Sequence, residues 1–395
     1  MKAPSTISDK KIILHQGVYK QIATVPEAVF MITGMTIGAG VLGIPYVVAR
    51  VGLLIGISYI LILGLVMLGL NLMIGEVTLK TNEQLQLPGL VGKYLGGWAK
   101  NLSSVLVIVS AYGSLLIFII GEGQSLSALF SGNPLWWGVF FWSIGSFIVW
   151  KGLRMIKVFE KVIGSIVILI LAALSVFLLP KFQVANLFYS NPANFFLPLG
   201  VILFALSNSA AVVEAHALLP RSQRHFRRAL IIGTLIPIGL YILFAAAVVG
   251  AQGLGTTEVA TIGLGKVFGS VVLVAANLFA IMAMGTGFVG NGIVLKQTLV
   301  WDNKINKILA EFLVILVPLA LYLAGIRSFV GMLGIIGGLL FSLQSLLLVL
   351  ACWRAHKAGG LNTSRYNLRY FWVLIVPIFF VFATVTFFSL LKLFK

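Results

Sequence analysis

A glycine-rich stretch interrupts the first long apolar segment of this sequence. The segment runs from about residue 25 to 49, long enough to span the hydrocarbon core of a bilayer, and Gly38-Ala39-Gly40-Val41-Leu42-Gly43 lies near its middle. Glycine disfavours a helix interior, and lipid-exposed irregular backbone is not tolerated in hydrocarbon. We therefore predict a broken helix whose freed amides and carbonyls face protein or a water-filled cavity, where they can bind a ligand.

The same six residues also match the GxGxxG pattern of dinucleotide-binding loops. That pattern requires a preceding strand, a following helix and an acidic residue about 20 positions further on. Residues 53–70 contain no acidic residue and form another apolar segment, and a second copy at 285–290 also lies inside an apolar segment. Neither copy therefore indicates a nucleotide site.

The composition is typical of a polytopic membrane protein. Hydrophobic residues make up 60% of the chain, charged residues 10%, and the mean hydropathy is +1.08. These values exclude the soluble globular classes. We expect an all-α integral membrane protein with the lipid bilayer as its surroundings. Eleven transmembrane helices are predicted near residues 25–49, 52–75, 102–130, 135–150, 158–179, 195–219, 229–251, 266–295, 308–325, 328–352 and 369–391.

The net charge of +18 would suit a nucleic-acid partner, but the Lys and Arg residues fall mainly in alternate loops. The positive-inside rule explains this distribution, so no nucleic-acid partner is expected. The expected location is the cytoplasmic (inner) membrane of a prokaryote, with the N-terminal segment, residues 1–24, in the cytoplasm. An odd number of helices then places the C-terminus outside. One cysteine, Cys352, excludes an intrachain disulfide, and the scattered histidines predict no metal site.

A second interruption is predicted in the segment near 195–219. The run Phe204 to Ala211 places Ser207, Asn208 and Ser209 in the middle of an apolar segment, about 168 positions after Gly40. Inverted-repeat transporters break the first helix of each half in this way. The alternative is that the serines only let neighbouring helices pack closely.

The two breaks predict a single transporter domain over residues 1–395. We expect two inverted five-helix repeats with helices 1 and 6 broken at mid-membrane, and one additional helix. In this division the first repeat covers 25–180, the second covers 195–352, and helix 11 covers 369–391.

Opposed backbone ends at the two breaks suit a zwitterion. The positive dipole end of an unwound half-helix attracts a carboxylate, and carbonyls near Phe204 and Ala205 would accept an ammonium group. Small residues such as Gly40 and Ala205 are expected to leave room for a bulky side chain. The predicted substrate-binding residues are Thr36, Ile37, Gly38, Ala39, Gly40, Val41, Phe204, Ala205, Ser207, Asn208 and Ser209.

The sequence leaves two alternatives for the coupling ion, a proton and sodium. Intramembrane carboxylates are usually functional, which makes Glu122 and Glu214 candidates for proton coupling, unless they are paired near the interface. Alternatively, the carbonyl of Ala283 and the hydroxyl of Thr286, on one helix face, would hold sodium with carbonyls of the first break. Thr286 would otherwise bond back to its own helix. No cofactor other than the coupling ion is expected.

Several motifs together resemble a known family. Gly34-Met35-Thr36-Ile37-Gly38-Ala39-Gly40-Val41-Leu42-Gly43-Ile44-Pro45-Tyr46, with Gly75-Glu76-Val77-Thr78-Leu79, Gly121-Glu122-Gly123 and Leu295-Lys296-Gln297-Thr298, looks like the tryptophan/tyrosine (aromatic amino acid) permease family of the amino acid/polyamine/organocation superfamily. The resemblance spans nearly the whole chain. It implies a LeuT-like fold, alternating access and secondary transport of amino acids.

The sequence departs from the pattern of that superfamily at two places. Relatives often have Gly-Phe where Asn208-Ser209 stand, and a serine where Gly287 stands. The first departure weakens the inference about the substrate, and the second weakens the inference of sodium coupling. Some proton-driven relatives carry a lysine in the middle of helix 5 in place of sodium, but residues 162–179 contain none.

The predicted function is therefore a symporter that imports neutral, aromatic or large aliphatic, amino acids across the cytoplasmic membrane, coupled to protons. Sodium coupling, amino acid exchange and a non-transporting amino acid sensor are the alternatives. An enzyme would need clustered His, Asp or Glu at catalytic spacing, and a channel would need a ring of like residues, and the sequence indicates neither. Oligomeric state is not predicted.

Overall fold

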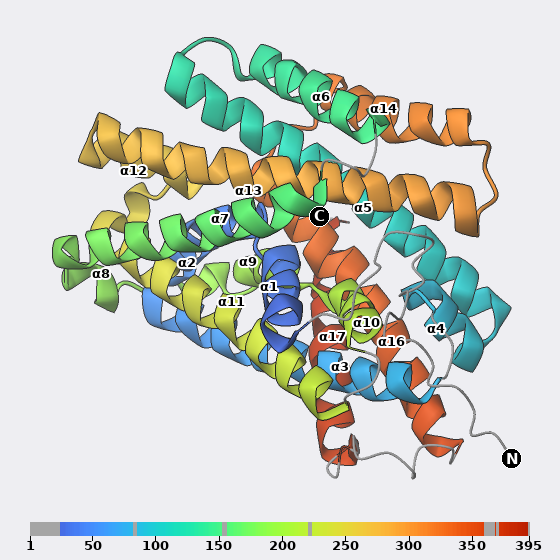
Figure 1. Ribbon diagram of the computed structural model, residues 1–395. Coiled ribbons are helices and arrows are strands. Elements are labelled where there is room, and N and C mark those ends of the chain that lie inside the picture. Colours follow the sequence, from blue (N-terminus) through green and yellow to red (C-terminus); the bar gives the residue numbers. More distant parts are fainter. Residues whose placement is uncertain are drawn as a thin grey trace, which may run out of the picture.

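The computed structural model describes residues 24–81, 85–151, 156–219, 223–358, 368 and 371–393. Nearly all of the predicted cytoplasmic N-terminal segment, residues 1–23, therefore lies outside the described residues. Within the described ranges all regular structure is helical (Figure 1).

The helices are bounded as follows, in chain order. They are α1 (Val25–Thr36), α2 (Gly40–Val51), α3 (Leu53–Lys80), α4 (Leu87–Leu95), α5 (Gly97–Phe130), α6 (Pro134–Lys151), α7 (Ile156–Leu178), η2 (Leu179–Lys181), α8 (Ala185–Phe188), η3 (Pro192–Asn194), α9 (Leu197–Leu206), α10 (Ser209–Leu218), α11 (Gln223–Gln252), η4 (Gly253–Gly255), α12 (Ala260–Phe268), α13 (Ser270–Gln297), η5 (Thr298–Asp302), α14 (Lys307–Leu323), α15 (Phe329–Ile335), η6 (Ile336–Phe341), α16 (Ser342–Lys357) and α17 (Phe371–Leu393).

Eight helices of the described part are long and apolar enough to cross a membrane, and α1 with α2 forms a ninth span bent by 58°. The helices α6, of 18 residues, and α14, of 17 residues, occupy two further predicted segments. The total of eleven spans stays a prediction.

Several predicted segments have different bounds in the structure. The segment expected at 266–295 is two helices, because α12 ends at Phe268 and is followed by Gly269, whose φ of +91° favours glycine and stops the helix before α13 begins. The helix expected at 102–130 begins earlier, at Gly97, directly after the short helix α4.

The helices pack into two neighbouring groups. In the upper part of Figure 1, α5 lies against α6, α13 and α14. Below them, α3 packs on α11, and α16 packs on α17. The broken helices lie between these groups: α1 contacts α11, and α9 contacts both α2 and the π-helical segment η6.

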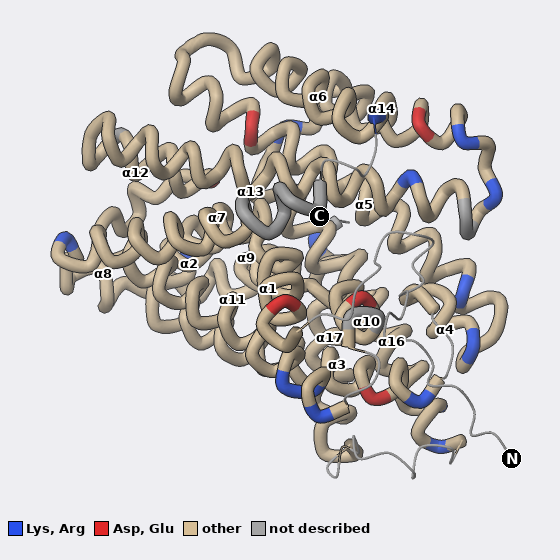
Figure 2. The backbone as a smooth tube through the Cα atoms, in the orientation of Figure 1, with Lys and Arg blue, Asp and Glu red and all other residues tan. Residues whose placement is uncertain are grey.

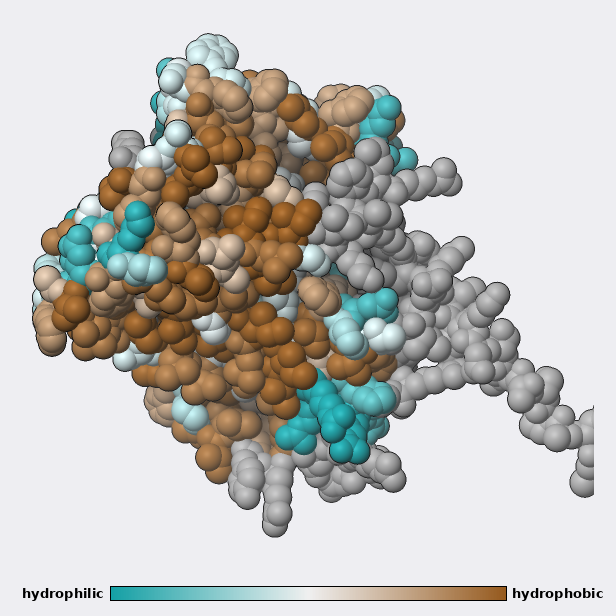
Figure 3. Space-filling model, turned by 60° about the vertical axis from the view of Figure 1, so that its left-hand side comes forward, coloured by the Kyte–Doolittle hydropathy of each residue, from teal (hydrophilic) through white to brown (hydrophobic). Residues whose placement is uncertain are grey.

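The surface agrees with a membrane location. Figure 3 shows a broad apolar band on one face, with hydrophilic side chains gathered toward its edges. Most described Lys and Arg residues gather at the right-hand ends of the helices in Figure 2. Such an asymmetry is what the positive-inside rule produces, although which end is cytoplasmic stays a prediction.

Candidate functional site

The first helix is interrupted at the glycine-rich stretch. The helix α1 ends at Thr36, Ile37 is extended with φ −83° and ψ 99°, and α2 begins at Gly40. The first amides of a helix have no partner within it, so those of Gly40 and Val41 point toward the break. The break therefore presents a positive helix end beside the carbonyl end of α1.

The second interruption falls where the polar run stands. The helix α9 ends at Leu206, Ser207 is extended with φ −74° and ψ 106°, and α10 begins at Ser209. Phe204, on the last turn of α9, stacks on Phe341 with ring centroids 5.5 Å apart.

The two breaks lie directly against each other. A Cβ atom added at Gly40 would lie 2.5 Å from the Cα atom of Ala205 and 2.6 Å from its Cβ atom. The expectation that these two small residues leave room for a substrate side chain is therefore wrong, since they allow the two backbones to touch. A Cβ atom at Gly38 would meet no atom of the described residues within 4 Å, so the break adjoins open space there within the described part of the chain.

The side chain of Asn208, at the second break, forms a hydrogen bond to the first break. Its Nδ2 donates to Thr36 Oγ1 at 2.8 Å, and its Oδ1 accepts from Asn71 Nδ2 at 2.6 Å. The Thr36 hydroxyl in turn donates to the Ile32 carbonyl at 2.7 Å. Both ends of the Asn208 side chain are thus engaged with protein, and it is 4% exposed.

Tyr241 of α11 reaches both breaks. Its hydroxyl lies 2.9 Å from the carbonyl oxygen of Thr36 and 3.2 Å from that of Ala205. Asn71 of α3 also lies within hydrogen-bond distance of Thr234 of α11, at 3.4 Å. These side chains are fully or almost fully buried.

Asn71, Thr234 and Tyr241 are missing from the residues predicted for the site. A signal was present for one of them, because an asparagine in the middle of an apolar transmembrane segment requires a polar partner. Thr234 and Tyr241 give a weaker signal, since both residue types also occur at helix contacts.

On the α2 side, the site is covered by α15. A Cβ atom at Gly43 would lie 2.6 Å from Leu333 Cδ1, and one at Gly121 would lie 2.8 Å from Phe329. Both of these α15 side chains are completely buried. The helix is held from the loop before α12, where Glu258 Oε2 accepts from the Val330 amide at 3.2 Å.

The opposite flank of the site is less covered. On α1, Phe30 is 46% exposed and Met35 is 41% exposed, and a Cβ atom at Gly34 would meet no described atom within 4 Å. Together with the open space at Gly38, this gives the first break one covered side and one uncovered side.

The two proton-coupling candidates differ in their surroundings. Glu122 of α5 is completely buried, and neither of its carboxyl oxygens has a hydrogen-bond partner among the described residues. Its neighbour Gly121 packs on Met284 and Phe329, beside the cover of the site. Glu214, on α10, is only partly buried.

The predicted sodium ligands lie on α13. The Thr286 hydroxyl lies 2.8 Å from the Met282 carbonyl, to which it donates, and 3.2 Å from that of Ala283, so it is engaged within its own helix. Gly287 abuts α5, because a Cβ atom there would lie 2.6 Å from Phe118 Cζ. A side chain at this position would therefore require the Phe118 ring to move.

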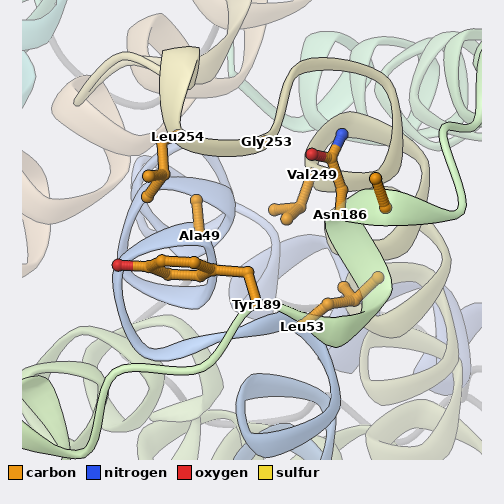
Figure 4. Close-up of a pocket in the computed structure, with 8 residues that line it drawn as sticks. Ala49, Leu53, Asn186, Tyr189, Val249, Gly253 and Leu254 are labelled. Carbon is orange, nitrogen blue, oxygen red and sulfur yellow. The ribbon is translucent and has the colours of Figure 1, made fainter.

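A cavity of about 280 Å³ lies away from both breaks, at the far end of α2 (Figure 4). Ala49 and Leu53 line it from one side, and Asn186, Tyr189 and Leu254 line it from others. It contains none of the residues predicted for substrate binding. The two breaks are instead joined by the Gly40–Ala205 contact and by hydrogen bonds from Asn208 and Tyr241.

The fold and the paired breaks define a polytopic membrane protein of LeuT-like architecture. The solved structure "Crystal structure of MhsT in complex with L-phenylalanine" has a similar fold, with a TM-score of 0.68, 15% sequence identity, and coverage of 94% of this chain and 99% of that chain. This likeness concerns the fold alone.

The chain belongs to the tryptophan/tyrosine permease family, whose model matches residues 22–387. It is 28% identical to the tyrosine-specific transport system 2 of Haemophilus influenzae over 56% of this chain and 56% of that relative, just over half its length. It is 24% identical to the tyrosine-specific transport system 1 of the same organism, over 83% and 87%. It is 22% identical to the glutamine transporter 2 of Aliivibrio fischeri, over 78% and 83%.

Proposed function

We propose that this protein is a secondary active transporter that imports a neutral amino acid, aromatic or large aliphatic, across the cytoplasmic membrane by alternating access. The observation that carries the proposal is the contact between the two helix breaks. The first amides of α2, at Gly40 and Val41, and the carbonyl ends of α1 and α9 bring opposite partial charges together. A zwitterionic α-amino acid has the complementary charges.

Membership of the permease family supports amino acid transport, and two of the relatives carry tyrosine in their names. The open space next to Gly38 supports a substrate whose side chain extends away from the Gly40–Ala205 contact.

Protons are the coupling ion we propose, with Glu122 as the carrier. A fully buried carboxyl without a hydrogen-bond partner is stable when protonated and costly when ionised. Sodium coupling has less support, since the Thr286 hydroxyl donates within its helix and Gly287, which packs on Phe118, offers no side-chain ligand.

Uptake into proteoliposomes tests the function and the coupling ion together. Purified protein would be given labelled L-tyrosine, L-tryptophan or L-leucine under an imposed pH gradient or an imposed sodium gradient, each applied alone. The proposal expects accumulation with the pH gradient and none with sodium alone. Accumulation with sodium alone would refute proton coupling, and uptake only into vesicles preloaded with amino acid would identify an exchanger. Saturable binding without any uptake would identify a sensor.

A further inference from the structure

Three oxygen atoms from three helices meet between the breaks. They are the carbonyl oxygens of Thr36 and Ala205 and the hydroxyl oxygen of Tyr241, which lies 2.9 Å and 3.2 Å from the two carbonyls. The exposed fractions of these residues are 6%, 2% and 0%. The group is therefore held by packing, and its spacing is fixed by the protein.

The hydroxyl cannot satisfy both carbonyls at once. A phenol has one proton to donate, whereas each carbonyl oxygen has two lone pairs. Thr36 is the last residue of α1, and Ala205 belongs to the last turn of α9, where carbonyls lack partners within the helix and carry partial negative charge. The pair of carbonyls therefore keeps capacity for further N–H donors.

We propose that Tyr241 is a positioning residue of the substrate site. Its hydroxyl sets the separation of the Thr36 and Ala205 carbonyl oxygens, and those two oxygens together accept N–H groups of the substrate ammonium. This inference rests on the proposed function, because it assumes an amino acid substrate. Tyr241 acts through the two carbonyls and belongs to neither broken helix.

The other contact between the breaks does not perform this task. Asn208 reaches Thr36 through the threonine hydroxyl, at 2.8 Å, and so holds the side chain. Tyr241 reaches the carbonyl oxygens themselves. The asparagine fastens the breaks together, whereas the tyrosine fixes the two atoms that would bind the ammonium group.

The test removes the hydroxyl and keeps the ring. Purified wild-type protein and Tyr241→Phe would be compared by competition against labelled L-tyrosine, using unlabelled L-tyrosine and its des-amino analogue 3-(4-hydroxyphenyl)propionate. Loss of a hydrogen-bonding arrangement around a charged group weakens binding about tenfold or more. Tyr241→Phe is expected to lose that factor for L-tyrosine and to bind the analogue as the wild type does, so discrimination between the two probes falls.

Tyr322→Phe is the matched control. The Tyr322 hydroxyl also donates to a backbone carbonyl, that of Pro134, at 3.0 Å, and Tyr322 is 2% exposed. This bond joins α14 to the start of α6, away from the breaks. Tyr322→Phe therefore removes a comparable buried hydrogen bond and is expected to keep the wild-type discrimination between the probes.

Tyr241→Met is a second variant without a hydroxyl, with a flexible side chain that adapts to the space of the ring. Wild-type affinity for L-tyrosine in either folded Tyr241 variant would overturn the inference. An equal loss for both probes, or failure of both variants to fold, would show a structural role and overturn it too. If the wild type binds none of L-tyrosine, L-phenylalanine and L-leucine saturably, the proposed function itself fails.

Discussion

The contact between Gly40 and Ala205 predicts that a single methyl group added at Gly40 destabilises the protein. In Gly40→Ala, the new Cβ atom would start 2.5 Å from the Ala205 Cα atom and 2.6 Å from its Cβ atom. Carbon atoms pack at about 3.5–4.0 Å, so the start of α2 must move away from α9 by about 1 Å. The nearest atoms belong to the backbone and Cβ, so no rotamer change relieves the clash.

The expected cost is that of overpacking a core, about 1–3 kcal/mol of unfolding free energy. Because the carbonyls of Thr36 and Ala205 separate at the same time, uptake of amino acid should fall further than the stability alone requires. Gly38→Ala is the matched control, since its Cβ atom would meet nothing within 4 Å in the part of the chain that the structure describes. It should change the unfolding free energy by no more than about 0.5 kcal/mol.

Both variants are measured by thermal unfolding in detergent with a fluorogenic thiol dye. Cys352 is the one cysteine in the sequence and is completely buried, so labelling reports unfolding. Uptake into proteoliposomes is measured beside it. A Gly40→Ala protein as stable and as active as the wild type would refute the close contact of the two breaks.

Three further predictions follow from buried polar groups. Asn71→Leu leaves Asn208 Oδ1 without its donor and should lower the unfolding free energy by about 1–3 kcal/mol, measured with the thiol dye. Unchanged stability would contradict the hydrogen bond between Asn71 and Asn208. Glu122→Gln should remove the response of uptake to an imposed pH gradient while the protein stays folded, and a retained response would exclude Glu122 as the carrier. Lys80→Met leaves Glu76, its partner at 2.7 Å, buried and unpaired, and should cost about 3–5 kcal/mol. The double variant with Glu76→Gln should regain most of that loss, which thermal unfolding would detect.

The sequence predicted the places of the breaks because their signals are local. Glycines at 38, 40 and 43 and three polar residues at 207–209 each disfavour continuous helix within a few positions. The salt bridge of Glu76 with Lys80 could be predicted for the same reason, as the residues lie one helical turn apart.

The partners of the breaks could not be predicted, because they come from distant parts of the chain. Tyr241 is 205 positions from Thr36 and 36 from Ala205, and Asn71 is 137 from Asn208. A local pattern does not show which helices meet. The same limit explains why Gly40 was taken for a space-making residue, since its neighbour Ala205 belongs to the other half of the chain.

Counterflow in proteoliposomes tests the central claim most directly, because it detects carrier-mediated movement whichever ion is coupled. Vesicles containing the purified protein would be preloaded with unlabelled L-tyrosine and diluted into labelled L-tyrosine. The account predicts a transient accumulation of label that protein-free vesicles lack and that excess L-phenylalanine suppresses. Absence of such accumulation for L-tyrosine, L-phenylalanine, L-tryptophan and L-leucine alike would contradict a transport site for neutral amino acids at the two breaks.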